Sequence, residues 1–107
     1  YFGSDGKRPA GKVTVFATAM LPPDAPKREA VAWGIERKDG GRGFGIVMPH
    51  FYRNWANEDL RRLILNGIVW SSKLDVPRGG VKSPPPDLGQ FAPESVEPKQ
   101  RPPAQPK

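Results

Sequence analysis

The sequence contains no cysteine, so this chain has no disulfide, no thiolate metal ligand and no cysteine nucleophile. It has a single histidine, His50, and scattered carboxylates, a composition that predicts no metal site and no bound cofactor. No stretch approaches the ~20 consecutive apolar residues that a membrane-spanning helix needs. We therefore expect neither a metal ion nor a membrane among its partners.

Concentrated positive charge is also missing, although the chain of 107 residues has a net charge of +6. Its lysines and arginines are spread along the sequence, with no basic block and no RNA-binding or helix-turn-helix signature. This distribution disfavours nucleic acid as a partner. The composition leaves open the compartment, cytoplasm or periplasm, and the oligomeric state.

Proline is abundant and unevenly placed, since nine of the 14 prolines lie from Pro77 onward. Between residues 83 and 107 there is little that is apolar apart from Leu88, Phe91 and Val96. Such a segment cannot bury enough surface to offset the entropy that is lost on ordering. We expect a folded part over residues 1–81 and a proline-rich disordered tail over residues 82–107.

Three stretches before the middle of the chain have the composition of β-strands. They are residues 12–20, 30–37 and 43–48. Alternation in the first strand predicts that Val13, Val15 and Ala17 share one face. The dipeptide Asp39-Gly40 lies between the second and third strands and is a strong hairpin signal, because both positions tolerate a positive φ. The last two strands are therefore expected to pair as a hairpin.

A helix is expected over residues 57–73, with Asn57 as its N-cap and acidic residues in its first turn. Its apolar positions form a wide stripe, which indicates that the helix packs on more than one side. Gly67 lies in this stripe, and we expect it to permit close packing. A helix of this kind needs a sheet against one face and a further element, or another chain, against a second face.

The segment between the third strand and the helix, residues 50–56, holds the candidate site. His50 follows a core strand, and binding groups often lie on loops that a sheet positions, so it is the candidate catalytic acid–base group. The alternative is a histidine that only hydrogen-bonds the turn. The candidate substrate-binding residues crowd the same loop, because aromatic faces and hydrogen-bonding groups suit a sugar. They are Tyr52, Arg53, Asn54 and Trp55.

Other conspicuous residues are interpreted structurally. Trp33 and Trp70 lie among apolar neighbours and are expected in the core, whereas Trp55 fits either a sugar-stacking role or packing of the loop against the helix. Arg61 and Arg62 are expected on a solvated helix face. The glycine-rich run at residues 39–45 joins two strands and lacks the Gly-Lys-Ser/Thr ending of a phosphate-binding loop.

The run from residue 31 to residue 81 resembles the C-terminal part of the ThuA-like (trehalose-utilisation) family. Family proteins have a Val-Ala-Trp strand, a Gly-Arg-Gly hairpin, a His-Phe-x-x-Asn-Trp loop, a helix with Arg-x-Leu-x-x-Asn-x-Ile-x-Trp, and a Val-Pro-x-Gly-Gly-Val exit. The matching residues here are Val31 to Trp33, Gly41 to Gly43, His50, Phe51, Asn54, Trp55, Arg61, Leu63, Asn66, Ile68, Trp70 and residues 76–81.

The resemblance implies an α/β fold of the class I glutamine-amidotransferase-like (flavodoxin-like) kind, a three-layer sandwich. The strand, hairpin, loop and helix of this chain are expected at one edge of a mostly parallel sheet. Residues 1–81 are then the C-terminal portion of the domain, a fragment that lacks the upstream strands and helices. His50 takes the place of the triad histidine of the amidotransferases.

Two departures bear on the chemistry that the resemblance implies. Tyr52 stands where amidotransferases have a glutamate and where ThuA-like proteins usually have a second histidine. Met48-Pro49 replaces a Gly-Gly pair, and Pro49 has no N–H to donate. An active glutamine amidotransferase is therefore not expected. We expect a carbohydrate-linked role, either hydrolysis or isomerisation of a small sugar with His50, or non-catalytic binding of a sugar or a protein.

Overall fold

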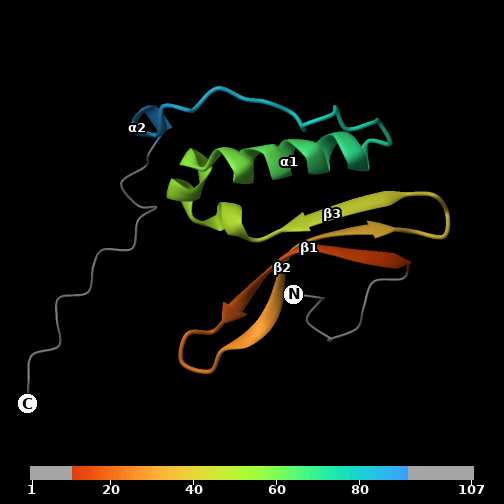
Figure 1. The fold of residues 1–107 in the computed structure, drawn as a ribbon, viewed down its shortest axis with the longest axis horizontal. Coiled ribbons are helices and arrows are strands. Elements are labelled where there is room, and N and C mark those ends of the chain that lie inside the picture. The colour runs from red at the N-terminus through yellow and green to blue at the C-terminus, as the bar shows by residue number, and fades with distance from the viewer. Residues whose placement is uncertain (1–10, 92–107) are drawn as a thin grey trace, which may run out of the picture.

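The structure, a computed structural model, describes residues 11–91 and shows a small α/β unit (Figure 1). The helix α1 lies along one face of a three-stranded antiparallel sheet in the order β1-β2-β3. This confirms the α/β class and the order of strand, hairpin, loop and helix. The elements are β1 (Lys12–Leu21), β2 (Lys27–Glu36), β3 (Arg42–Ile46), the 3-10 helices η1 (Met48–His50) and η2 (Tyr52–Ala56), α1 (Glu58–Ser71) and α2 (Leu88–Phe91).

Every strand pair among the described residues is antiparallel, so the mostly parallel sheet and the three-layer sandwich stay predictions. The second strand begins at Lys27, three residues earlier than expected, because residues 27–30 pair with the end of β1. The predicted loop at residues 50–56 is instead two short 3-10 helices. Of the predicted tail, residues 82–91 are described and include α2 and the hydrogen bond between Arg61 and Ser83, whereas residues 92–107 lie outside the described residues.

The β2–β3 turn is the predicted hairpin, and Asp39 organises it. Its Oδ1 accepts hydrogen bonds from the Gly41 amide at 2.8 Å and from the Arg37 Nε at 3.1 Å. These two donors hold the pKa of Asp39 below its ordinary value, and the Gly41 amide has the larger effect. The pKa of Asp39 is therefore lower in the folded protein than in the unfolded chain. The ionised Asp39 stabilises the fold at pH values above its unfolded pKa, and this stabilisation is lost as the pH falls through its folded pKa.

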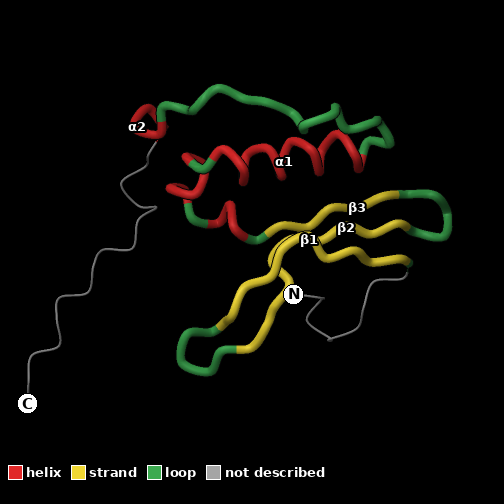
Figure 2. Tube along the Cα trace, viewed as in Figure 1, coloured by secondary structure: helices red, strands yellow, loops and turns green. Residues whose placement is uncertain are grey.

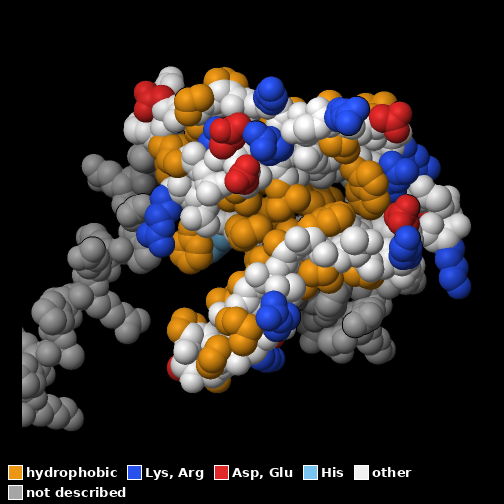
Figure 3. Space-filling model, viewed as in Figure 1, with side chains coloured by type: hydrophobic (Ala, Val, Ile, Leu, Met, Phe, Trp, Pro, Cys, Tyr) orange, Lys and Arg blue, Asp and Glu red, His pale blue; other side chains and the backbone are white. Residues whose placement is uncertain are grey.

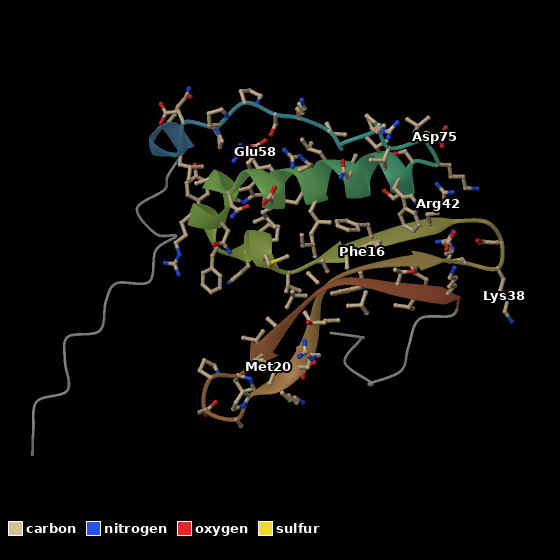
Figure 4. All side chains as sticks on the ribbon, in the orientation of Figure 1. Phe16, Met20, Lys38, Arg42, Glu58 and Asp75 are labelled. Carbon is tan, nitrogen blue, oxygen red and sulfur yellow. The ribbon has the colours of Figure 1, made fainter. Side chains whose placement is uncertain are left out.

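A β-bulge at Phe16 turns that side chain toward α1. The register passes from Val15 opposite Trp33 to Ala17 opposite Ala32, which leaves Phe16 without a partner. Partners in a ladder share a face, so Ala17 lies on the face opposite Val15, and the single face predicted for the first strand is wrong. Figure 4 shows Phe16 between the sheet and α1, where its ring lies 6.2 Å from that of Phe44.

Beyond the bulge, β1 and β2 continue as a two-stranded ribbon that extends past β3 (Figure 1). Residues 18–21 pair only with residues 27–30, whereas β3 pairs with β2 from Ala32 to Glu36. Met20, near the end of this ribbon, is 53% exposed (Figure 4). The ribbon therefore lacks the second neighbour that supports the central part of β2.

The helix α1 begins as predicted, since the Asn57 side chain accepts a hydrogen bond from the Leu60 amide at 2.9 Å. Gly67 lies in the middle of the helix, is buried, and faces the Phe44 ring of β3. A Cβ atom at Gly67 would collide with that ring. The expectation that Gly67 permits close packing is confirmed.

Side chains do not fill the interface between α1 and the sheet along its whole length. Figure 3 shows hydrophobic side chains between α1 and the strands on the visible face. A cleft of about 330 Å³ opens there. It is lined by Phe16, Phe44, Leu63, Asn66, Gly67, Trp70 and Val76.

After α1 the chain turns back and runs as loop along the far side of the helix to α2 (Figure 2). Two helix side chains hold this return segment, which comprises residues 72–87. The Asn66 Oδ1 accepts a hydrogen bond from the Val81 amide at 2.8 Å, and the Arg61 Nε donates to the Ser83 hydroxyl at 3.1 Å. The second covering element expected for the helix is thus supplied in part by the chain itself.

Replacing Gly67 with alanine tests the close helix–sheet contact. Alanine gains about 1 kcal/mol of helix propensity, but the collision with Phe44 costs about 1–3 kcal/mol of overpacking. We expect Gly67→Ala to lower the free energy of unfolding measured with urea. Ile68→Ala, at the neighbouring exposed position, is the control and should change it less. A more stable Gly67→Ala protein would contradict the contact.

Candidate functional site

His50 lies at the end of η1, directly after β3. The His50 amide donates a hydrogen bond to the Val47 carbonyl at 3.2 Å, which closes the short 3-10 turn. Pro49 lies in the first two positions of this turn. The side chain is exposed, and its ring meets the Phe51 ring edge-on with centroids 5.3 Å apart. Within residues 11–91 the imidazole has no hydrogen-bond partner. It therefore does not serve as a bonded turn residue there.

Phe51 and Arg53 extend the exposed group that His50 begins. The Phe51 side chain is 46% exposed, between η1 and η2. The Arg53 guanidinium lies 5.5 Å from the centre of its ring, a cation–π arrangement. We call these three residues, His50, Phe51 and Arg53, the exposed loop face. The candidate site residues do not include Phe51, although a large aromatic side chain beside the histidine is a signal in the sequence.

The other candidate residues donate to backbone carbonyls. The Asn54 amide group donates to the Met48 carbonyl at 2.8 Å, and the Trp55 indole N–H donates to the Pro49 carbonyl at 3.3 Å. The Tyr52 hydroxyl donates to the Leu88 carbonyl at 2.9 Å. These bonds fold the loop and fasten α2 to it. Of the five candidates, His50 and Arg53 are the two whose polar groups have no hydrogen-bond partner within residues 11–91, and both belong to the exposed loop face.

Residues of the loop line two separate cavities. One, of about 370 Å³, is lined by Asn54 together with residues of η1 and the first turns of α1. The other, of about 260 Å³, is lined by Tyr52, Trp55, Arg61, Pro86 and Leu88. The structure therefore does not gather the predicted residues in one pocket, because Asn54 lines the first cavity and Tyr52 and Trp55 line the second.

Arg61 is buried, with 7% of its surface exposed, so the prediction of a solvated helix face is wrong for this residue. Its Nη1 donates to the Trp55 and Ala56 carbonyls, both at 2.8 Å. The neighbouring Arg62 is half-buried, and its guanidinium pairs with Glu58 at 2.6 Å and with Asp59 at 3.3 Å, while its buried Nε has no hydrogen-bond partner within residues 11–91. Arg61 thus joins the end of η2 to the helix.

The burial of Arg61 depends on partners that the pattern along the helix does not show. Ile64, Leu65 and Ile68 follow it at spacings of three, four and seven residues, which share one face of a helix, but Ile68 is 56% exposed, so this row does not mark a buried face. Ser83, its other partner, carried no signal, because the contact spans 22 residues of sequence.

Between residues 11 and 91, no three side chains of His, Asp or Glu come close enough together to hold a metal ion. No helix in the same span combines the length and the apolar composition that crossing a bilayer requires.

Comparison with family models, with curated proteins and with solved structures finds no match for this chain.

Replacing the two neighbouring arginines separates a buried from an exposed role. Arg61→Met leaves the Trp55 and Ala56 carbonyls without a donor, at a cost of about 1–3 kcal/mol in the free energy of unfolding. Arg62→Met removes two ion pairs to exposed carboxylates, worth at most about 1 kcal/mol, and a buried Nε–H that has no partner within residues 11–91. Chemical denaturation of both variants should therefore show the larger loss for Arg61→Met. Equal losses would mean that the buried hydrogen bonds contribute nothing.

Proposed function

We propose that this chain is part of a ThuA-like domain that binds a small carbohydrate at the exposed loop face. The sequence motifs around the β2–β3 hairpin, the loop and α1 support the family. The order of elements supports it too, because a hairpin leads into a histidine-bearing loop and then a helix. The amidotransferase-like three-layer sandwich is part of the same proposal.

One observation carries the carbohydrate proposal: His50, Phe51 and Arg53 are exposed together at the end of β3. A sugar presents C–H groups on its faces and hydroxyls around its edge. The Phe51 ring offers an apolar surface for a sugar face, and the His50 and Arg53 side chains offer hydrogen-bonding groups beside it.

Binding without catalysis is the function that the geometry supports best. In acyl-transfer triads, a carboxylate holds the histidine in its reactive orientation. Within residues 11–91 no carboxylate bonds to His50. The Tyr52 hydroxyl, two residues further on, is already bonded to the Leu88 carbonyl. The imidazole therefore has no described partner that would orient it for chemistry.

Hydrolysis or isomerisation of the sugar is the second candidate, and the exposure of His50 favours it. An accessible imidazole without a hydrogen-bond partner can take a proton from a bound hydroxyl or give one back. The same side chain thus serves either function, and turnover distinguishes them.

The binding test is a titration of the chain with trehalose, glucose and an oxidised form of each, followed by the amide NMR signals of residues 47–57. We expect saturable shifts with at least one sugar. Phe51→Ala should weaken binding by about tenfold, because stacking is lost, whereas Leu74→Ala, which removes a 62% exposed side chain elsewhere, should not. Equal affinity for the parent and Phe51→Ala would place the sugar elsewhere.

The turnover test uses the same sugars and follows their conversion by proton NMR. Conversion that His50→Ala abolishes, with binding retained, establishes the enzyme. Binding without conversion in the parent chain establishes the binding domain. If no sugar on the panel binds, the carbohydrate proposal is wrong.

A further inference from the structure

The strand β1 is an edge of the sheet. It pairs with β2 on one side, and within residues 11–91 no strand lies on its other side. An edge strand presents a row of unpaired N–H and C=O groups to any further strand, and proteins usually protect such an edge with charges, with proline or by keeping it short. β1 is 10 residues long, contains no proline and carries a single charge, that of Lys12. The bulge at Phe16 is therefore its main protection.

Exposed apolar side chains gather on the same strand. Nine large hydrophobic side chains are exposed among the described residues, and four of them belong to β1. They are Val15, Phe16, Met20 and Leu21. The other edge strand, β3, contributes none of the nine and is only 5 residues long. Of the two edges, β1 is therefore the one at which a further strand covers more apolar surface.

The register shows which backbone groups of β1 point away from β2. Successive residues of a strand direct their N–H and C=O groups to opposite sides. The Val31 carbonyl and the Arg37 amide form hydrogen bonds on the β3 side of β2, so the even-numbered residues of β2 bond with β1. The β1 residues opposite odd-numbered residues of β2 therefore direct their backbone groups outward. These outward residues are Val13, Val15, Ala19 and Leu21.

The outward residues are arranged symmetrically along the sequence about Ala17. An antiparallel copy of β1 that is centred on this residue places Val13 opposite Leu21 and Val15 opposite Ala19. Each of these pairs joins outward backbone groups of the two strands, as a hydrogen-bonded antiparallel ladder requires. The bulge disturbs the ladder only at its centre, where the two-fold axis passes. Because the edge matches its own antiparallel copy, a second copy of the chain is the partner that it fits.

The charges favour the same arrangement. Antiparallel pairing brings Lys12 beside the turn at residues 22–26 of the second copy. That turn carries Asp24, whose carboxylate has no partner within residues 11–91, and Lys12 has only an exposed ion pair with Glu36 at 4.0 Å. Parallel pairing in register places the two Lys12 side chains next to each other instead, and like charges at such positions are destabilising.

We propose that two copies of this chain associate through β1, which pairs antiparallel with β1 of the second copy and joins the two sheets into one. The pairing supplies partners for the outward backbone groups of both strands and covers apolar side chains of β1. Lys12 of each copy lies beside Asp24 of the other. The exposed loop face follows β3, at the opposite edge of the sheet, so the inference does not rest on the carbohydrate proposal.

Sedimentation velocity tests the association of the whole chain from micromolar to millimolar concentration. We expect the apparent mass to rise from 11.8 kDa to a plateau at twice that value. A mass that stays at 11.8 kDa throughout overturns the proposal. Growth beyond the plateau also overturns it, because a two-fold pair leaves β1 of neither copy free.

Amide hydrogen exchange, measured by NMR at low and high concentration, locates the interface. Exchange at Val13, Val15, Ala19 and Leu21 should slow by about tenfold as the dimer forms, because these amides gain acceptors. The Glu29 amide is the internal control and should not change. It lies on the side of β2 that extends past β3, where the proposed dimer adds no strand. A dimer in which the four β1 amides gain no protection uses another surface and overturns the proposal.

Two variants test the edge and its charges. Ala19→Pro removes an outward N–H at a position where an edge strand accepts proline, and it should weaken dimerisation by about tenfold or more. The control Ala19→Thr keeps the N–H and should leave dimerisation nearly unchanged.

Asp24→Lys reverses the charge beside Lys12 of the second copy and should weaken dimerisation by about threefold to tenfold. Asp75→Lys makes the same charge change at an exposed residue after α1 and should have no effect. Unchanged dimerisation in a folded Ala19→Pro protein overturns the proposal. If Ala19→Pro does not fold, equal dimerisation constants for Asp24→Lys and Asp75→Lys overturn it.

Discussion

The distance between α1 and the sheet is set where the Phe44 ring lies against the helix backbone at Gly67. Because glycine has no side chain, the helix can approach β3 until the ring and the backbone are in contact. Gly34 of β2 has a similar effect beneath, since a Cβ there would lie 3.0 Å from Phe16 and 3.2 Å from Trp70. The two glycines therefore leave room for the rings of Phe16, Phe44 and Trp70 in the narrow space between the helix and the sheet.

The chain between β3 and α1 is folded into two 3-10 turns. Their backbone carbonyls then need donors, which Asn54, Trp55 and Arg61 supply. Side chains whose chemical type suggests ligand binding therefore stabilise the backbone of the loop. His50, Phe51 and Arg53 remain outward.

Local features of the fold could be predicted from sequence, because the residues that cause them are neighbours. The Asp39-Gly40 turn, the Asn57 cap and the close packing at Gly67 each depend on one or two residues. The bulge at Phe16 and the burial of Arg61 could not be predicted this way, since they depend on contacts with distant strands and with the return segment. The candidate site divides likewise: the exposure of His50 follows from its place after β3, whereas the partner of Tyr52 lies 36 residues away.

The ribbon formed by the ends of β1 and β2 gives the central strand two different kinds of surroundings. From Ala32 to Glu36, β2 has a strand on both sides, and α1 covers one face. From Lys27 to Ala30 it has β1 alone. Amide hydrogen exchange reports such differences as local opening free energies, which fall where buried contacts are few. We therefore expect amide exchange along this single strand to be faster toward Lys27 than toward Gly34, because only one neighbouring strand protects its first residues.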